Sequence, residues 1–213
     1  MIETPNIRQT AADLTRRLGG VELPAAGLWN IPSGWAIIEL SVPKLFGPAL
    51  RSRIRLKQGM IAIADDPSHS TAHLSLDAVS VRTGNHAIDQ YLHQEVLDVG
   101  KYSTLPVRIA TVAHRGGSTW VADGWVTVRG VARPIELAIS YEGVFRKGSV
   151  ALFRAQASLP LRSLLPAEGG MRGRLLAGRT LRMDIEIHAE PVRTSTNSAL
   201  AGQRRQDAEL AAV

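Results

Sequence analysis

The stretch DGWVTVRGVARPIEL, residues 123–137, contains two runs in which apolar and polar side chains alternate, separated by a break at Gly-Val-Ala-Arg-Pro. Val126 and Val128 share one side of the first run, and Ile135 and Leu137 share one side of the second. A period of two is typical of β-strands with one buried face. The stretch therefore predicts two strands joined by a tight turn, whose apolar sides face either a packed core or an enclosed ligand.

The same period continues over most of the chain between residues 28 and 192. The clearest run is TLRMDIEIHAE at residues 180–190. Similar runs cover residues 35–43, 51–64, 71–81, 106–115, 118–129, 134–146 and 149–160. About eight or nine strands, each with one apolar and one polar face, are typical of an antiparallel barrel or sandwich. The sequence therefore predicts an all-β fold.

One segment, GNHAIDQYLHQEVLDVGKY at residues 84–102, has a different period. Its apolar residues lie at helical spacing, at Ile88, Tyr91, Leu92 and Val96. Because the segment lies between two strands, we expect one short crossover helix that closes one end of the β structure. Asp89 lies early in this helix, where a carboxylate suits the helix dipole, so a structural role is favoured over a catalytic one.

Both ends of the chain differ from this central region, residues 27–192, which we expect to form the barrel domain. Residues 1–26 are predicted to form an N-terminal helix and a linker, because Ile7, Ala11, Leu14 and Leu18 form one helical stripe and Gly19-Gly20 would end it. We expect this helix to lie on the main domain, and a lid or a homodimer contact is the alternative. Residues 193–213 are polar and alanine-rich, and are expected to form a mobile tail.

Composition sets limits on location and partners. The 213 residues are 45% apolar and include no cysteine, so disulfides and thiolate metal sites are excluded. The N-terminus has no apolar signal segment, and no run of about 18 apolar residues occurs, so we expect a cytoplasmic protein without a transmembrane segment. The formal charge is +6, but the arginines are scattered, which favours a solvated surface over specific nucleic-acid binding.

Motifs for catalysis or metal binding are not found in the sequence. The closest histidine pairs are His69 with His73 and His86 with His93. Their predicted separations, roughly 13 Å along a strand and 10 Å along a helix, are too long for a shared metal. Nucleophile-elbow, phosphate-loop and zinc-helix patterns are also missing. We therefore expect neither a cofactor nor an enzyme, although catalytic residues far apart in sequence would leave no local motif.

Three further observations concern the segments SVRTGNHAIDQYL, VLDVGKY and GWVTVRGVARPIEL. Together these segments resemble the YceI-like family, whose members are lipocalin-like barrels that bind polyisoprenoid lipids. The residues that carry the resemblance are Ser80, Val81, Thr83, Asp89, Leu92, Asp98, Lys101, Tyr102, Gly124, Val126, Thr127, Gly130, Val131, Arg133, Pro134, Ile135 and Leu137. The chain departs from the family pattern at Trp35-Ala36, Lys44 and Ser103, which leaves the polar head group of a ligand open.

This resemblance implies a closed, antiparallel, lipocalin-like β-barrel of about eight strands. It also implies non-catalytic binding, transport or storage of a long apolar lipid, either a polyisoprenoid or an isoprenoid quinone. Two alternatives are an enzyme acting on an isoprenoid-like lipid and a solid barrel that serves as a protein-interaction module. A barrel of about eight strands can be filled by its own side chains or hold one ligand, and the residues alone favour neither.

If the barrel holds a lipid, its lining should come from the inward positions of the strands. The predicted lipid-binding residues are Val42, Ile54, Leu56, Leu74, Leu76, Val107, Ile109, Val126, Val128, Ile135, Leu137, Ile139, Leu181, Met183, Ile185 and Ile187. Each of them would also suit an ordinary core. Trp120 and Trp125 have opposite parity on one strand, so at most one of them is directed inward.

Overall fold

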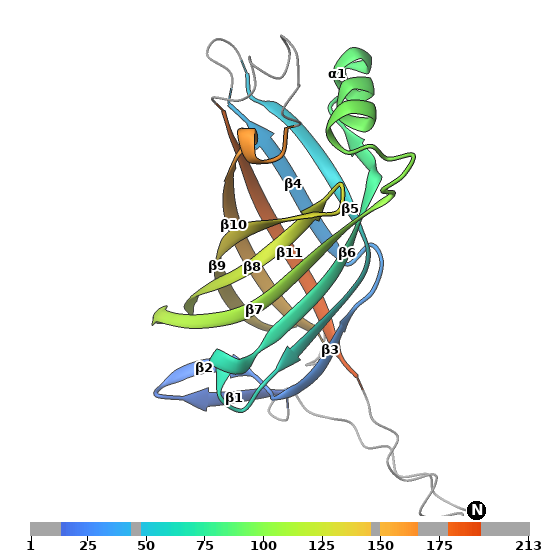
Figure 1. Cartoon of the computed structure of the whole chain (residues 1–213). Coiled ribbons are helices and arrows are strands. Elements are labelled where there is room, and N and C mark those ends of the chain that lie inside the picture. Colours follow the sequence, from blue (N-terminus) through green and yellow to red (C-terminus); the bar gives the residue numbers. More distant parts are fainter. Residues whose placement is uncertain (1–13, 44–47, 146–149, 166–178, 193–213) are drawn as a thin grey trace, which may run out of the picture.

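A computed structural model describes residues 14–43, 48–145, 150–165 and 179–192. These residues form strands with two short helical segments and two 3-10 turns (Figure 1). The strands are β1 (Thr15–Leu18), β2 (Val21–Pro24), β3 (Gly27–Ile31), β4 (Ala36–Val42), β5 (Leu50–Ile63), β6 (Thr71–Arg82), β7 (Thr104–Gly116), β8 (Thr119–Val128), β9 (Val131–Phe145), β10 (Val150–Pro160) and β11 (Thr180–Pro191). The helical segments are α1 (His86–Tyr91), the π-helix η3 (Leu92–Val96), and the 3-10 turns η2 (Pro67–His69) and η4 (Leu161–Ser163).

Strands β3 to β11 form one closed antiparallel barrel. Neighbours in the chain pair from β4 to β11, and β11 returns to pair with β4, which closes the ring. Strand β3 pairs with the far ends of β5 and β11, so β3 and β4 together fill one of eight positions around the barrel. Closure leaves no free edge along the ring, and the inward side chains of all strands meet in one interior. The predicted eight-stranded barrel is confirmed.

The predicted N-terminal helix is not found where the structure describes this segment. Residues 15–18 and 21–24 form the hairpin β1–β2 instead, with Leu18 opposite Val21. Gly19 and Gly20 both have positive φ angles, +57° and +82°, which suits a two-residue hairpin turn better than a helix end. Residues 1–13, which include Ile7 and Ala11, lie outside the described residues, as does the predicted tail at 193–213.

The crossover helix is found where the sequence predicts it. Asn85 caps α1, because its side-chain oxygen accepts a hydrogen bond from the backbone N–H of Ile88 at 3.1 Å. The helix continues as the π-helix η3. This conformation is rare in proteins overall, and where it occurs it is often at a functional site. Figure 1 shows α1 at one end of the barrel and the β1–β2 hairpin at the opposite end.

Strand β5 departs from simple alternation in its middle. The pairing register with β6 shifts between Leu56 and Gln58, as expected for a β-bulge. Ile54 and Leu56 are buried, but after the shift Gly59 takes the buried side and Met60 is 39% exposed. Simple alternation along residues 51–64 predicts that Met60 shares a side with Ile54 and Leu56. This prediction is wrong, because one bulge moves every later side chain to the other face.

Candidate functional site

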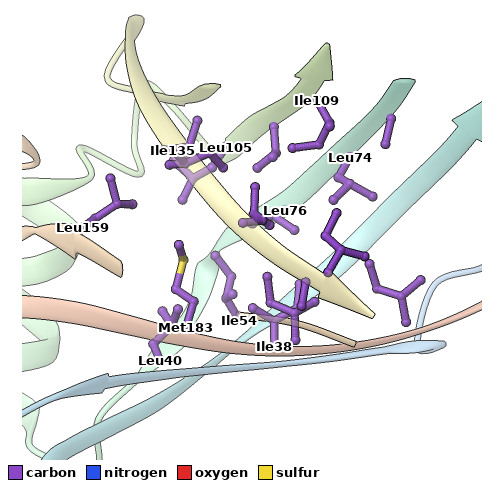
Figure 2. Close-up of a pocket in the computed structure, with 18 of the residues that line it drawn as sticks. Ile38, Leu40, Ile54, Leu74, Leu76, Leu105, Ile109, Ile135, Leu159 and Met183 are labelled. Carbon is purple, nitrogen blue, oxygen red and sulfur yellow. The ribbon is translucent and has the colours of Figure 1, made fainter. Parts of the chain in front are cut away.

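The barrel encloses a cavity of about 300 Å³. Its wall is built mainly from inward side chains of strands β4 to β11, and Figure 2 shows apolar side chains from opposite walls pointing toward one another. Apart from the sulfur of Met183, the side chains labelled in Figure 2 present carbon atoms alone. Ligand pockets are typically roughly 300–1,000 Å³ and mostly apolar. The barrel is therefore hollow, and the alternative of a solid barrel is not supported.

Almost all of the residues predicted as lining do face this cavity. The exception is Leu56, which is 2% exposed and packs in the core without lining the cavity. The four residues predicted from the cleanest strand, β11, line one wall at consecutive inward positions, and Val126, Val128, Ile135 and Leu137 from the opening sequence motif line another. The structure thus brings these residues together around one space, while their contact with a lipid stays a prediction.

Trp120 lines the cavity, whereas Trp125 is 43% exposed on the outer face of β8. The two tryptophans therefore have opposite orientations, as their parity on one strand requires. Arg108 and Pro134 are the register partners of Trp125 on the adjacent strands, so Trp125 lies in an outward-facing row. Trp120 has the same parity as Val126 and Val128, which are predicted to face inward, so extending that parity along the strand identifies Trp120 as the inner one.

Several lining residues were missed by the sequence analysis. On the strands these include Ile38, Leu40 and Leu159, which lie at inward positions of runs predicted as strands, and Leu105, which lies one residue before the predicted run at 106–115. Their alternation was visible, and extending the inward parity to every run would have found them. Ile61 lies beyond the bulge in β5, where the alternation changes phase, so parity counted from Ile54 misplaces it.

The crossover helix supplies one end wall of the cavity. Ile88 of α1 and Leu92 and Val96 of η3 line it, so the helical spacing seen in the sequence marks the face that covers the barrel end. The turn between β8 and β9 holds this cover from the side, because Nη1 of Arg129 donates to the backbone oxygen of Glu95 at 2.9 Å. The α1–η3 segment therefore closes one end of the apolar interior, and it is attached to the strands by hydrogen bonds.

Asp89 fixes the helix to the end of β6. The amide and the hydroxyl of Thr83 both donate to one carboxylate oxygen of Asp89. Desolvation raises the pKa of Asp89, but the hydrogen bonds from Thr83 and the nearby Arg82 cation outweigh it, so the pKa lies below its ordinary value. The carboxylate is thus held ionised by structural partners, in agreement with the structural role expected from the sequence.

Polar side chains on the cavity wall are few. Apart from Trp120, among the described lining residues they are Arg16, Ser52, Ser70, Thr71, Thr83 and Tyr141. None of the described lining residues is an Asp, Glu, His or Lys. Burial raises the pKa of the Tyr141 hydroxyl well above its ordinary value, and the Glu22 carboxylate adds to this effect. The wall described here thus offers hydrogen-bond donors rather than a paired acid and base.

A metal site is also not found in the part of the chain that the structure describes. No three His, Asp or Glu side chains lie close enough together there to hold a metal ion. His188 interacts with Glu186 at 3.1 Å, and the Glu186 pKa is lowered by this hydrogen bond and by the nearby Arg154. These groups form a surface ion-pair cluster on β10 and β11 and do not line the cavity.

Comparison with known proteins agrees with this geometry. A model of the YceI-like domain matches residues 33–189, which is most of the chain, and the chain therefore belongs to the YceI-like family. A search of curated protein sequences found no match. Among the described residues, no helix is long and apolar enough to cross a membrane.

Solved structures with the same fold come from several bacteria. BcnA of Burkholderia cenocepacia is 11% identical, with a TM-score of 0.59 over 72% of this chain and 95% of BcnA. A polyisoprenoid binding domain from Saccharophagus degradans, implicated in plant cell wall breakdown, is 14% identical, with a TM-score of 0.54 over 77% of this chain and 98% of that domain. The YceI protein of Campylobacter jejuni is 18% identical, with a TM-score of 0.56 over 71% of this chain and 90% of that protein. At these identities the comparison shows a shared fold.

Proposed function

We propose that the protein binds a long apolar lipid, a polyisoprenoid or an isoprenoid quinone, inside its barrel and carries or stores it without chemical change. The observation that carries this proposal is the enclosed cavity with its almost wholly apolar wall. Membership of the YceI-like family supports it, and so does the fold shared with a polyisoprenoid binding domain. The sixteen predicted lining residues of the sequence analysis, Leu56 excepted, are the proposed lipid contacts.

Burial of hydrocarbon is sufficient to drive such binding. Each methylene-sized group moved from water into the cavity contributes roughly 0.8 kcal/mol, so one five-carbon isoprenoid unit contributes about 3–4 kcal/mol. The cost of immobilising the ligand is on the order of 4–15 kcal/mol, so three or four buried units outweigh most or all of it. A site of this kind needs an apolar interior and few polar contacts, as the described wall provides.

Binding without catalysis is favoured over the enzyme alternative by the chemistry of the wall. A general acid or base is most often a His, Asp, Glu or Lys with a pKa shifted toward the working pH. The described lining residues include none of these types. The Tyr141 pKa is shifted upward, away from neutral pH, which suits a hydrogen-bond donor better than a base. The cytoplasmic location and the homodimer expected from the sequence stay predictions.

The proposal is tested by analysing what the purified full-length chain contains. An organic extract of the folded protein, measured by mass spectrometry, should contain an isoprenoid lipid in near-stoichiometric amount. An extract of an unrelated protein purified in parallel controls for lipid carried over from membranes. If the extract contains no such lipid and the protein also fails to bind an added C20 isoprenoid, the carrier function is wrong.

A further inference from the structure

Two hydrogen-bond donors on the cavity wall have no partner among the residues that the structure describes. They are the hydroxyl of Tyr141 and Nε of Arg16, and both atoms are buried. Tyr141 is 6% exposed, and its ring packs against Phe153 with the ring centroids 5.5 Å apart. A buried polar group without a partner is rare in folded proteins, because it loses its water and gains nothing in return. Both residues line the cavity, so a bound ligand is the natural source of the missing acceptor.

The two donors lie toward the same end of the barrel. Arg16 is on β1, opposite Leu23 of β2, and Leu23 also lines the cavity. Strand β2 packs against β9, which carries Tyr141, and the Tyr141 amide donates to Ser118 at the adjacent β7–β8 turn. Figure 1 shows this hairpin at the end of the barrel opposite α1. The donors therefore mark the hairpin end, whereas the helix covers the other end with apolar side chains.

The rest of the Arg16 guanidinium is already occupied. Nη1 donates to the backbone oxygen of Asp65 at 2.8 Å, and Nη2 donates to the backbone oxygen of Ala64. Nη1 also lies 3.5 Å from the Asp65 carboxylate. The guanidinium is planar and rigid, so these contacts fix the direction of the remaining Nε–H. The described part of the chain thus fixes the direction of the Arg16 Nε–H donor but supplies no acceptor for it.

We propose that the Tyr141 hydroxyl and the Arg16 Nε–H together bind a neutral acceptor oxygen, such as a ketone or quinone carbonyl, in the head group of the apolar ligand. This inference rests on the proposed lipid-binding function and adds the orientation of the ligand, with its head at the hairpin and its tail toward α1. Arg16 lies outside residues 33–189, which match the family model, whereas Tyr141 lies inside them.

A neutral oxygen suits these donors better than a phosphate. Two donors can serve one carbonyl oxygen, whereas a phosphate carries several charged oxygens and is usually met by several donors and uncompensated cations. The Arg16 charge already faces Asp65, and Glu22 acts electrostatically on Tyr141, which disfavours a second anion there. The raised pKa of Tyr141 keeps its hydroxyl protonated, so it stays a donor throughout the neutral pH range.

The test uses the full-length chain, stripped of lipid, and three probes with the same geranylgeranyl chain. One probe ends in a methyl ketone, one in a plain hydrocarbon end, and one in a monophosphate. We expect the wild-type protein to bind the ketone about tenfold more tightly than the hydrocarbon, since one buried hydrogen bond typically changes affinity by about that factor. Tyr141→Phe and Arg16→Lys should each remove most of this preference, measured within each variant as the ratio of ketone affinity to hydrocarbon affinity.

Matched controls separate an anchor from a merely structural role. Tyr102→Phe removes a tyrosine hydroxyl that does not line the cavity, and Arg17→Lys changes the exposed neighbour of Arg16 on β1. Both control variants should keep the ketone preference. Tyr141→Phe should leave the ligand-free protein at least as resistant to urea as the wild type, because it removes an unpaired buried hydroxyl, whereas a structural hydroxyl would lower that resistance.

The outcomes distinguish the anchor from the carrier function. If ketone and hydrocarbon bind the wild type equally, or the ketone preference survives in Tyr141→Phe, the anchor is wrong and the carrier function stands. If the phosphate probe binds most tightly, the head-group class is wrong. If none of the three probes binds, the anchor is wrong, and the carrier function fails with it when the organic extract also contains no isoprenoid lipid.

Discussion

The amide and the hydroxyl of Thr83 donate to the same carboxylate oxygen of Asp89, each at 2.7 Å. Both residues belong to the sequence motif that resembles the YceI-like family, and neither acts on a ligand through these bonds. Their effect is to fix α1 to the end of β6, so that Ile88 and Leu92 cover the cavity. The motif that carries the family resemblance thus includes residues that attach the cover of the cavity to the barrel, and Thr83 also lines the cavity itself.

Asp89→Asn should lower the free energy of unfolding at neutral pH by about 1 kcal/mol, because it weakens two hydrogen bonds to a charged group. The Asp89 pKa is lower in the folded chain than its ordinary value of 3.8. Its contribution is therefore fully present above pH 3.8 and is lost as the pH falls through the folded-state pKa. Urea unfolding of wild type and variant should differ at neutral pH and converge in acid.

The exposed carboxylate of Asp123 on β8 provides the control for this comparison. Asp123→Asn should leave the unfolding curve unchanged at neutral pH. If Asp89→Asn instead behaves like Asp123→Asn at every pH, the Thr83–Asp89 contact does not stabilise the fold.

Filling the cavity should abolish lipid binding without unfolding the barrel. Leu76 lines the cavity from β6 and is 8% exposed, so Leu76→Trp places a larger side chain in the space that the lipid would occupy. Val79 lies on the same strand and is 40% exposed, so Val79→Trp is the matched control. We expect the organic extract of Leu76→Trp to lose most of its lipid and that of Val79→Trp to keep it. Circular dichroism of both variants checks that the strands persist, and full lipid occupancy in folded Leu76→Trp would contradict a ligand site inside the barrel.

The sequence predicts the barrel well where a strand alternates without interruption. On β11, Leu181, Met183, Ile185 and Ile187 all line the cavity as their parity requires. Prediction fails at Met60, because the bulge after Leu56 leaves no mark in the pattern of apolar residues. Parity is therefore reliable within a regular run and is lost across a bulge, which depends on pairing with a neighbouring strand.

The β1–β2 hairpin was missed for a different reason. Leu14 and Leu18 are four residues apart, which fits a helix, and Leu14 is indeed buried. The decisive feature is Gly19-Gly20, which can end a helix or close a hairpin, and local sequence does not distinguish the two. Packing of β2 against β9, far away in sequence, favours the hairpin. The cavity inside the barrel also cannot be predicted from the local sequence pattern, because it depends on how inward side chains from many strands fit together.

Gly124, in the middle of β8, should not tolerate a side chain. A Cβ at this position would overlap the backbone oxygen of Arg108 and lie 2.7 Å from Cδ1 of Ile109. Gly124→Ala should therefore force β7 and β8 apart and lower the free energy of unfolding by about 1–3 kcal/mol. Gly100→Ala is the control, because a Cβ there would meet nothing within 4 Å. Equal urea midpoints for the two variants would show that the close approach of these strands is not required.

The β1–β2 hairpin should control how long a ligand stays in the barrel, because Arg16, Leu23 and Pro24 line the cavity from it. Gly20 has a φ of +82°, which a β-branched residue adopts only with strain, so Gly20→Val should weaken the turn by about 1–2 kcal/mol. Amide hydrogen exchange in the hairpin, including the Ala25 amide that donates to the Leu14 oxygen at 2.8 Å, should then become faster. A bound isoprenoid should dissociate faster in the same variant, while exchange at the centres of β8 and β9 stays slow. Faster hairpin exchange without faster dissociation would mean that the ligand leaves by the α1 end, and the hairpin would then close the barrel without controlling release.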